Sequence, residues 1–371
     1  MKIAFLCKRQ YMSKDVILDK YARLYEIPNQ LAHLGHQVEC FCLSYQSHNE
    51  GTWDESDEHK QLIWHSKSYI GLKKVGILSY PFLLLQQLKQ YQPDIIITAS
   101  DIPHIVWGAW CSKKLSVPFV ADLYDNFEGF GQARIPGMKQ LLRKAVCQAQ
   151  LVTTTSQPLA DLVKLDYAAQ GQVISMPSTV DLQTFGKKNK QAAQAKFGLQ
   201  HHKQYIGTAG GLYKDKGVEV IYNAWEQIKN EMPNVHLVLA GPFQPDCPPP
   251  EDDRVHYLGA LPHHDIAMLF QALDVGIISI LDTPFGRYCF PQKAYEMLAC
   301  DLAVVVANVG EMNYLFSTTP QVLFKAGDQQ DLADKLKHQI THPVRAEVVI
   351  QDWRTIIKGI EPVIASLKVN T

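Results

Sequence analysis

A lysine and a glutamate stand three residues apart in a segment that begins with a proline, at Pro291, Lys293 and Glu296. Proline favours the first turn of a helix, where free backbone N–H groups and the helix dipole attract anions such as a diphosphate. On that helix Lys293 and Glu296 share one face, and the glutamate carboxylate can accept hydrogen bonds from ribose hydroxyls. The segment therefore predicts a nucleotide-binding helix. An ordinary ion pair on a solvated helix face would have the same spacing.

A second phosphate-binding candidate precedes this helix in the chain. A strand-like run ends at the pair Gly210 and Gly211, and Lys216 follows before the next helical pattern. Glycine lets the backbone approach a phosphate closely, and lysine adds a positive charge. Two further strand-like runs end at Gly241 and Leu258. A glycine pair is also common in plain turns, so this segment predicts a phosphate site only in combination with the proline-led helix.

The elements that must position these residues form two successive series, in which short Val- and Ile-rich runs alternate with helical patterns. The first series of runs comprises residues 3–7, 38–43, 95–98, 119–124, 151–156 and 173–176. The second comprises residues 205–209, 236–240, 255–258, 275–280, 302–307 and 322–324. Such alternation is typical of parallel sheets covered on both faces. We therefore predict an α/β protein with two Rossmann-like, doubly wound parallel-sheet domains that face each other across a cleft.

The boundary between the two predicted domains lies in residues 177–190, where Pro, Ser, Thr and Lys replace the periodic pattern. We place the first domain at residues 1–182 and the second at residues 183–350. Residues 351–371 follow the second domain and have the pattern of an amphipathic helix. A length of 371 residues is sufficient for two separate hydrophobic cores.

Composition restricts the class of protein further. A net charge of −1 and a pI near 6.9 give no sign of a nucleic-acid-binding surface. The eight cysteines form no Cys-x-x-Cys pair, which fits a reducing cytoplasm. The sequence contains neither a Gly-x-Gly-x-x-Gly dinucleotide-binding pattern nor a phosphate-loop motif. It also has no signal-peptide pattern at its start and no apolar run of membrane-spanning length.

The order of these landmarks resembles the retaining glycosyltransferases of family 4, also called group 1, which have the two-domain fold known as GT-B. The similar segments match the family's first helix and second strand, its glycine–lysine segment, several later strands and the segment after its donor site. They are residues 30–38, 210–217, 237–241, 255–259, 274–275, 296–299 and 304–306. Each match is short, and their common order and spacing carry the resemblance.

The resemblance implies transfer of a sugar, with retention, from a UDP- or GDP-linked donor to a glycan or a lipid-linked acceptor. It places the donor in residues 183–350 and the acceptor in residues 1–182, and it returns the helix in residues 351–371 to the first domain. No cofactor other than the donor is implied. The chain contains no Asp-x-Asp, the metal-binding pattern of the other main glycosyltransferase architecture, so we predict transfer without a metal.

Two departures from the family pattern concern the donor. Gly211 stands where the family commonly has an arginine, and Arg287 and Lys293 are the nearest candidates for the missing diphosphate contact. Tyr288 stands where the family often has a second glutamate, eight positions before Glu296, that contacts the donor sugar. Breaking the sugar–phosphate bond leaves negative charge on the phosphate, which the lysines and the helix start would stabilise.

For the acceptor side, the candidates are Asp122 and Asp125, which lie at the end of a strand-like run. Either carboxylate could steady the sugar cation or receive the acceptor's proton, and either could instead cap the next helix. Residues 8–11 stand where the family usually has paired glycines in its first loop. Residues 71–85 combine two lysines with a long apolar run, which would either contact an anionic membrane or belong to the core.

The resemblance implies a metal-independent glycosyltransferase in cell-surface polysaccharide or glycoconjugate assembly. The composition favours a cytoplasmic protein without a nucleic-acid partner, and residues 71–85 leave peripheral membrane contact as an option. Two alternatives remain open at the level of the sequence. One is a sugar-nucleotide epimerase of similar fold, which needs no acceptor. The other is a non-catalytic sensor that binds a sugar nucleotide without turnover.

Overall fold

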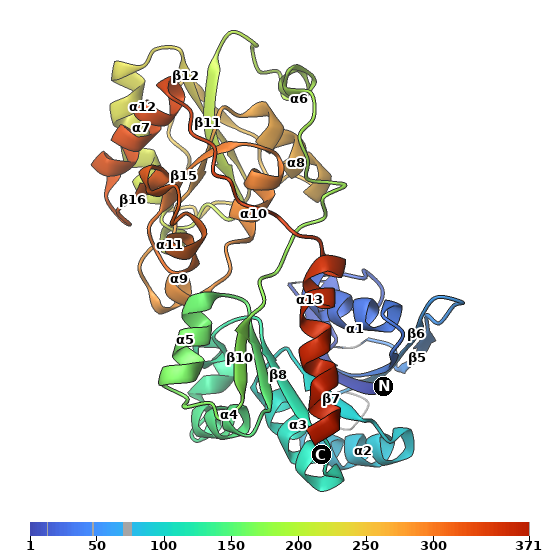
Figure 1. The fold of residues 1–371 in the computed structure, drawn as a ribbon. Helices are drawn as coiled ribbons and strands as arrows, with labels where there is room; N and C mark the ends of the chain where they lie inside the picture. The colour runs from blue at the N-terminus through green and yellow to red at the C-terminus, as the bar shows by residue number, and fades with distance from the viewer. Residues whose placement is uncertain (13, 47, 70–75, 371) are drawn as a thin grey trace. The chain divides into compact units, whose positions relative to one another are not determined.

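The computed structural model describes residues 1–12, 14–46, 48–69 and 76–370, and these form two compact units (Figure 1). Unit 1 contains Met1–Ser178 and Trp353–Thr371, and unit 2 contains Thr179–Asp352. Each unit is built on one main sheet of largely or wholly parallel strands with helices packed on it. The structure therefore confirms the predicted α/β fold class with parallel sheets.

The main sheet of unit 1 has eight strands in the order β10-β9-β8-β7-β1-β4-β6-β5. They are β1 (Lys2–Lys8), β4 (Gln37–Ser44), β5 (Gly51–Asp54), β6 (Gln61–Ser68), β7 (Ile95–Thr98), β8 (Phe119–Leu123), β9 (Leu151–Thr154) and β10 (Gln172–Ser175). Only the edge strand β5 runs antiparallel to its neighbour. All six strand-like runs of the first predicted series are confirmed. The sequence prediction missed β5 and β6, because β6 alternates buried and partly exposed residues instead of forming one apolar run.

The helices of unit 1, apart from the last one, connect these strands in the order expected for a doubly wound sheet. They are α1 (Ala22–His33), α2 (Gly76–Tyr91), α3 (Ile102–Leu115), α4 (Met138–Cys147), α5 (Gln157–Leu165) and α13 (Trp353–Ser366). Polar side chains cap the starts of α3 and α5. Asp101, for example, is the N-cap of α3 and accepts a hydrogen bond from the His104 backbone N–H at 3.1 Å.

Unit 2 has a six-stranded parallel sheet in the order β13-β12-β11-β14-β15-β16. Its strands are β11 (Gln204–Ala209), β12 (Val235–Ala240), β13 (Val255–Tyr257), β14 (Val275–Ile278), β15 (Ala303–Ala307) and β16 (Leu323–Phe324). Its helices are α6 (Lys190–Lys196), α7 (Val218–Glu231), α8 (His263–Ala272), α9 (Pro284–Tyr288), α10 (Gln292–Ala299), α11 (Glu311–Leu315) and α12 (Gln329–Thr341). The six predicted strand-like runs of the second series all correspond to strands of this sheet.

Part of the apolar run at residues 71–85 falls outside the described residues, which resume at residue 76. The described part belongs to α2, where Leu84 and Leu88 are buried and Phe82 is 66% exposed. The Phe82 ring packs edge-on against Trp110 of α3, with ring centroids 5.6 Å apart. None of the helices within the described residues combines the length and the apolar composition needed to cross a membrane.

The last helix, α13, belongs to the core of unit 1 rather than to the unit that precedes it in the chain. Its buried residues Ile357, Ile360 and Ile364 pack in the same cluster as residues of α1 and β1. A hydrogen bond adds to this contact, because His36 Nε2 lies 3.0 Å from the Glu361 carboxylate. Apolar burial of this kind accounts for most of the stability of a packed helix.

We expect Ile357→Ala, in the buried face of α13, to lower the free energy of unfolding by about 2–5 kcal/mol, because it leaves a cavity in the core. The matched control is Lys358→Ala, which changes an exposed neighbour on the same helix and should cost less than about 0.5 kcal/mol. Equilibrium denaturation in urea measures both. Equal effects of the two substitutions would contradict the packing of α13 in this core.

Candidate functional site

The candidate site in unit 2 begins where strands β11 and β12 end. Gly210 and Gly241 follow these strands with φ angles of +111° and +124°, which residues with a side chain rarely adopt. A Cβ atom on Gly241 would lie 2.0 Å from the Gly210 carbonyl oxygen, so position 241 has no space for a side chain. The Gly210 N–H donates to the Ala240 carbonyl at 2.9 Å. These two glycines therefore bring two backbone turns close together at the carboxyl edge of the sheet.

Lys293 reaches the same turn from α10. A Cβ atom on Gly210 would lie 3.2 Å from Lys293 Nζ, so the ammonium group lies directly against the Gly210 backbone. The sequence predicted Pro291 as the first residue of the helix. In the structure Pro291 is the N-cap of α10, and the helix starts one residue later, at Gln292. The lysine and the free N–H groups of the first helical turn thus lie at the same end of α10.

The charges around Lys293 act on its pKa. Burial lowers the pKa of the Lys293 ammonium from its ordinary value, and the nearby Lys216 lowers it further. The Glu296 carboxylate, one turn along α10, acts in the opposite direction and raises the pKa. These influences show that Lys216, Lys293 and Glu296 lie close enough to interact electrostatically. The positive charge of this cluster exceeds the negative charge by one.

Lys216 is held in place by an aromatic ring. Its ammonium Nζ lies 3.5 Å from the centroid of the Phe285 ring on α9, which is a cation–π contact. The next residue, Gly217, has a φ of +77° and is the N-cap of α7, and its carbonyl accepts a hydrogen bond from Ser279 Oγ at 2.7 Å. The sequence analysis found Lys216 but not Phe285 or Ser279, because neither belongs to a recognisable motif.

Glu296 provides the acceptor oxygens of the cluster. Its side chain is buried on α10, and its Oε1 lies 3.8 Å from His263 Nε2 at the start of α8. Within the described part of the chain, no hydrogen bond ties up this carboxylate. The Glu296 oxygens reach solvent although most of the side chain is buried, so the position is suited to a ligand that brings hydroxyl groups.

The remaining predicted residues of unit 2 are engaged in other contacts. The Arg287 guanidinium forms a two-pronged ion pair with Asp282, at 2.6 and 3.3 Å, on the surface. A Cβ atom on Gly211 would lie 2.6 Å from the Tyr213 ring, so ring packing explains this glycine. Leu258 packs against the hydrophobic core and donates its N–H to Leu239. The structure thus groups Gly210, Gly241, Lys216, Lys293 and Glu296, whereas Arg287 is held by Asp282.

In unit 1, Asp122 is buried at the end of β8 and is fully paired with Arg23 of α1. The guanidinium donates to both carboxylate oxygens at 2.6–3.2 Å, and Thr153 Oγ1 donates to Oδ1 at 2.6 Å. Arg23 Nη1 also donates to the Met176 carbonyl at 2.6 Å. This arrangement joins α1 to β8, β9 and the residue after β10. A carboxylate that is buried and paired with Arg23 in this way is poorly placed to receive an acceptor's proton.

Asp125 lies a few residues further on, in a different setting. Its carboxylate is half-buried and accepts the Asn126 backbone N–H at 2.7 Å. The short helix that follows is capped by Asn126, so neither aspartate fills the capping role considered from the sequence. Burial lowers the pKa of the Lys8 ammonium, and the nearby Asp125 carboxylate is one of the charges that act in the opposite direction. Lys8, at the end of β1, is therefore a neighbour of Asp125, whereas the sequence analysis named it only as part of the first loop.

Tyr124 connects Lys8 to the end of β7. Lys8 Nζ donates to the Tyr124 hydroxyl at 3.0 Å, and this hydroxyl donates to the Ser100 carbonyl at 2.8 Å. Ser100 has a φ of +91°, which is strained for a residue with a side chain. Lys8, Tyr124 and Asp125 thus form a polar group at the carboxyl edge of the unit 1 sheet, the edge where open α/β sheets bind ligands.

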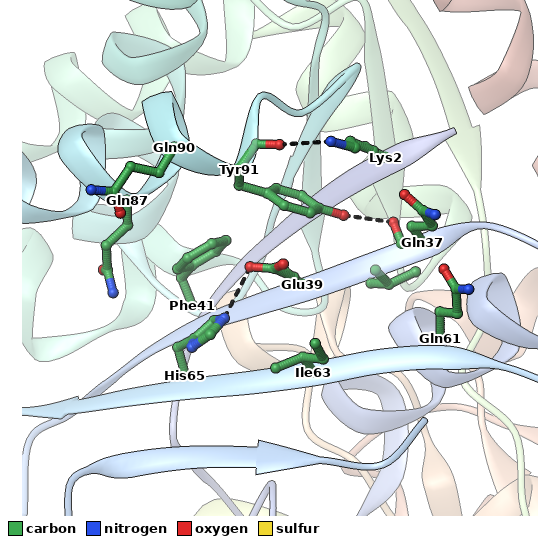
Figure 2. A pocket seen from close by; sticks show the side chains of 11 residues that line it. Lys2, Gln37, Glu39, Phe41, Gln61, Ile63, His65, Gln87, Gln90 and Tyr91 are labelled. Carbon is green, nitrogen blue, oxygen red and sulfur yellow. Dashed lines mark hydrogen bonds and ion pairs between the residues drawn. The ribbon is translucent and has the colours of Figure 1, made fainter. Parts of the chain in front are cut away.

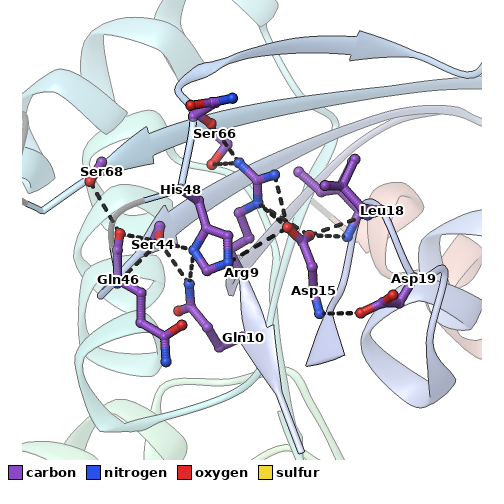
Figure 3. A network of polar contacts seen from close by, with 12 residues as sticks. Arg9, Gln10, Asp15, Leu18, Asp19, Ser44, Gln46, His48, Ser66 and Ser68 are labelled. Atoms are coloured by element: carbon purple, nitrogen blue, oxygen red, sulfur yellow. Dashed lines mark hydrogen bonds and ion pairs between the residues drawn. The ribbon is translucent and has the colours of Figure 1, made fainter. Parts of the chain in front are cut away.

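The loop after β1 lacks the paired glycines of the family pattern, and the side chain of Arg9 holds it in place (Figure 3). Its buried guanidinium pairs with Asp15 at 2.9 Å and donates to the Asn49 carbonyl and to Ser66. Asp15 lies in the small antiparallel pair β2 (Gln10–Tyr11) and β3 (Lys14–Asp15). Although burial acts to raise the pKa of Asp15, the hydrogen bond from Arg9 contributes to a net lowering. Residues 8–11 therefore form a fixed hairpin start.

The comparisons with known proteins agree with this organisation. The sequence model described as glycosyl transferases group 1 matches residues 203–342, and the one described as glycosyltransferase family 4 matches residues 22–184. Together the two matches cover most of both units. The chain belongs to the group 1 glycosyltransferases of family 4.

Curated relatives of this chain are glycosyltransferases too. The alpha-monoglucosyldiacylglycerol synthase of Streptococcus pneumoniae is 23% identical over 51% of this chain and 47% of its own length. The D-inositol 3-phosphate glycosyltransferase of Stackebrandtia nassauensis is 26% identical over 66% of this chain and 56% of its own length. The aligned part of the chain thus spans about half the length of these relatives.

Solved structures of similar fold extend over nearly the whole chain. Sucrose-phosphate synthase from Thermosynechococcus elongatus aligns with a TM-score of 0.72 at 16% identity and covers 100% of both chains. HepE from Anabaena, in complex with UDP, aligns with a TM-score of 0.71 at 18% identity and covers 99% of this chain and 100% of its own. This likeness confirms the predicted GT-B fold.

The pairing of Asp122 leads to a prediction about stability. Asp122→Ala should lower the free energy of unfolding by about 3–5 kcal/mol, because it leaves the Arg23 guanidinium buried without its partner. Urea denaturation measures the change. Replacing both residues, as Arg23→Met with Asp122→Leu, should restore most of the loss. A single variant as stable as the parent would show that the pair does not hold unit 1 together.

Proposed function

We propose that this chain is a retaining glycosyltransferase that binds a nucleotide diphosphate sugar in unit 2 and transfers its sugar without a metal ion. The observation that carries the proposal is the position of Lys293 Nζ against the Gly210 backbone, with Lys216 and Glu296 within electrostatic reach. The two lysines and the first turn of α10 would hold the diphosphate. Glu296 would accept hydrogen bonds from the ribose hydroxyls.

The reaction follows from where charge develops. The bond between the anomeric carbon and the phosphate oxygen breaks, and the acceptor oxygen bonds to that carbon on the same face. The acceptor's proton passes to the departing phosphate, so atoms and charge balance without a further reactant. Lys216 and Lys293 stabilise the phosphate more strongly as its charge grows, which lowers the barrier.

Donor and acceptor identities rest on the comparisons. We favour UDP as the nucleotide because the Anabaena structure of similar fold is a UDP complex. We favour a glycan or lipid-linked acceptor, in glycolipid or cell-surface polysaccharide assembly, because a related enzyme is a monoglucosyldiacylglycerol synthase. Retention rests on the family resemblance. The polar group of Lys8, Tyr124 and Asp125 is the proposed contact of unit 1 with substrate.

One experiment separates the proposed activity from its alternatives. The full chain is incubated with radiolabelled UDP-glucose, UDP-galactose and GDP-mannose, with and without EDTA, and the products are resolved. Slow release of free sugar with retained anomeric configuration, unaffected by EDTA, supports the proposal. An isomerised sugar nucleotide would show an epimerase, binding without turnover would show a sensor, and loss of activity in EDTA would contradict the metal-free site.

Glu296→Ala should weaken UDP binding by about 1.5–3 kcal/mol, because it removes a hydrogen bond to a charged group. Isothermal titration calorimetry gives the dissociation constants directly. Glu251→Ala, which removes an exposed glutamate of the same unit, is the control and should leave the affinity unchanged. Unchanged affinity in Glu296→Ala would remove this residue from the nucleotide site.

The lowered pKa of Lys293 predicts a pH dependence. As the pH rises through that lowered pKa, Lys293 loses its charge. The affinity for UDP should therefore decrease at a pH below 10.5, the ordinary pKa of a lysine. Lys293→Arg should bind UDP with little change over about pH 7 to 10, because a guanidinium stays protonated there. Titrations at several pH values test this. A pH dependence that persists in Lys293→Arg would assign the effect to another group.

A further inference from the structure

Unit 1 contains a groove that the proposed reaction does not use (Figure 2). Its volume is about 530 Å³, within the range of small-molecule sites. The first halves of β4 and β6 form one side, and the last turns of α2 form the other. Lys8 and Asp122 lie at the carboxyl ends of their strands, whereas Gln37 and Gln61, at this groove, begin theirs. The groove is therefore separate from the carboxyl edge of the sheet.

Glutamine side chains are the main polar groups of this groove. Gln37 and Gln61 line it from the two strands, and Gln87 and Gln90 line it from α2. Among the described residues, none of these four amides has a hydrogen-bond partner for its side chain. An amide offers both donors and acceptors without a net charge. Four of them facing one groove suit a neutral ligand with many hydroxyl groups.

The groove is lined by one lysine and one glutamate, Lys2 and Glu39, whose charges are of opposite sign. Glu39 accepts from His65 Nε2 at 2.9 Å, and Lys2 Nζ donates to the Tyr91 carbonyl at 3.3 Å. The groove therefore offers no uncompensated cluster of one sign that would select an anion or a cation. This charge balance distinguishes it from the lysine-rich cluster of unit 2.

The floor of the groove is held in a fixed shape. The His65 ring stacks on Phe41, with centroids 5.1 Å apart and an interplanar angle of 24°. The Tyr91 hydroxyl donates to the Gln37 carbonyl at 2.8 Å, which ties the end of α2 to β4. Together with Ile63, these rings give an apolar floor beneath the polar amides. An apolar base with convergent polar groups is the usual composition of a preformed ligand site.

From these observations we propose that the groove binds a neutral oligosaccharide, as a second carbohydrate site separate from the site of transfer. Sugar rings would lie with their C–H faces on Ile63 and Tyr91 and with their hydroxyls toward the glutamine amides. The biological meaning of this site rests on the proposed function, in which the acceptor is a glycan. A section of that glycan, distant from the reacting end, is the expected occupant.

The test uses the full chain and a panel of neutral hexasaccharides built from glucose, galactose, mannose or N-acetylglucosamine. Saturation-transfer difference NMR detects binding, and calorimetry measures affinity. We expect at least one hexasaccharide to bind, Gln87→Ala to weaken it about five-fold, and Gln61→Trp, which fills the groove, to abolish it. Gln86→Ala changes an exposed glutamine of α2 outside the groove and should leave the affinity unchanged.

Several outcomes would overturn the proposal. They are the absence of binding to every hexasaccharide, equal binding by the parent and Gln61→Trp, and equal weakening by Gln86→Ala and Gln87→Ala. A parent chain that binds no saccharide but dimerises in sedimentation, and becomes monomeric in Gln61→Trp, would assign the groove to a second copy. UDP titration of the same samples, which does not involve the groove, shows separately whether the proposed nucleotide site fails.

Discussion

The contact of the Lys293 ammonium with the Gly210 backbone is the constraint on which the candidate site depends. Glycine suits position 210, because the φ there is +111° and a Cβ atom would crowd the ammonium at 3.2 Å. The contact requires a second glycine at 241, because the two turns nearly touch. It also requires α10 to begin close to the end of β11, so that the lysine reaches the turn. The orientation of one helix relative to one strand therefore positions the charges that would meet a diphosphate.

The two units use buried charge in opposite ways. In unit 1 the buried pair of Arg23 and Asp122 is saturated with hydrogen bonds, and its carboxylate is almost completely shielded from solvent. In unit 2 the Glu296 side chain is also largely buried, but among the described residues its carboxylate has no hydrogen-bond donor, only His263 at 3.8 Å and the nearby charge of Lys293. A saturated pair stabilises the fold when both partners are present, whereas an unsaturated group is a position at which a ligand can supply the missing donors.

The sequence was a good guide to what is local and a poor one to what is not. Twelve apolar runs predicted strands because central parallel strands are buried on both faces and so carry continuous apolar sequence. The spacing of Lys293 and Glu296 was likewise readable, because it lies within one helical turn. The partner of Asp122 was not, because Arg23 is 99 residues away and has no motif. Strands β5 and β6, at the edge of the unit 1 sheet, were not predicted, because their partly exposed residues interrupt the apolar pattern.

Because α13 belongs to unit 1, the two units can complete their folding in only one order during synthesis. Unit 2 is one continuous segment, so all its residues are available as soon as Asp352 has left the ribosome. Unit 1 must wait for Ile357, Ile360 and Ile364 to fill its core, although most of its sequence is made first. Until α13 is made, the part of the unit 1 core that it covers is exposed and can form non-native contacts. Chaperones that bind nascent chains should therefore bind mainly to unit 1. Most of this unit leaves the ribosome first, but its core is completed last.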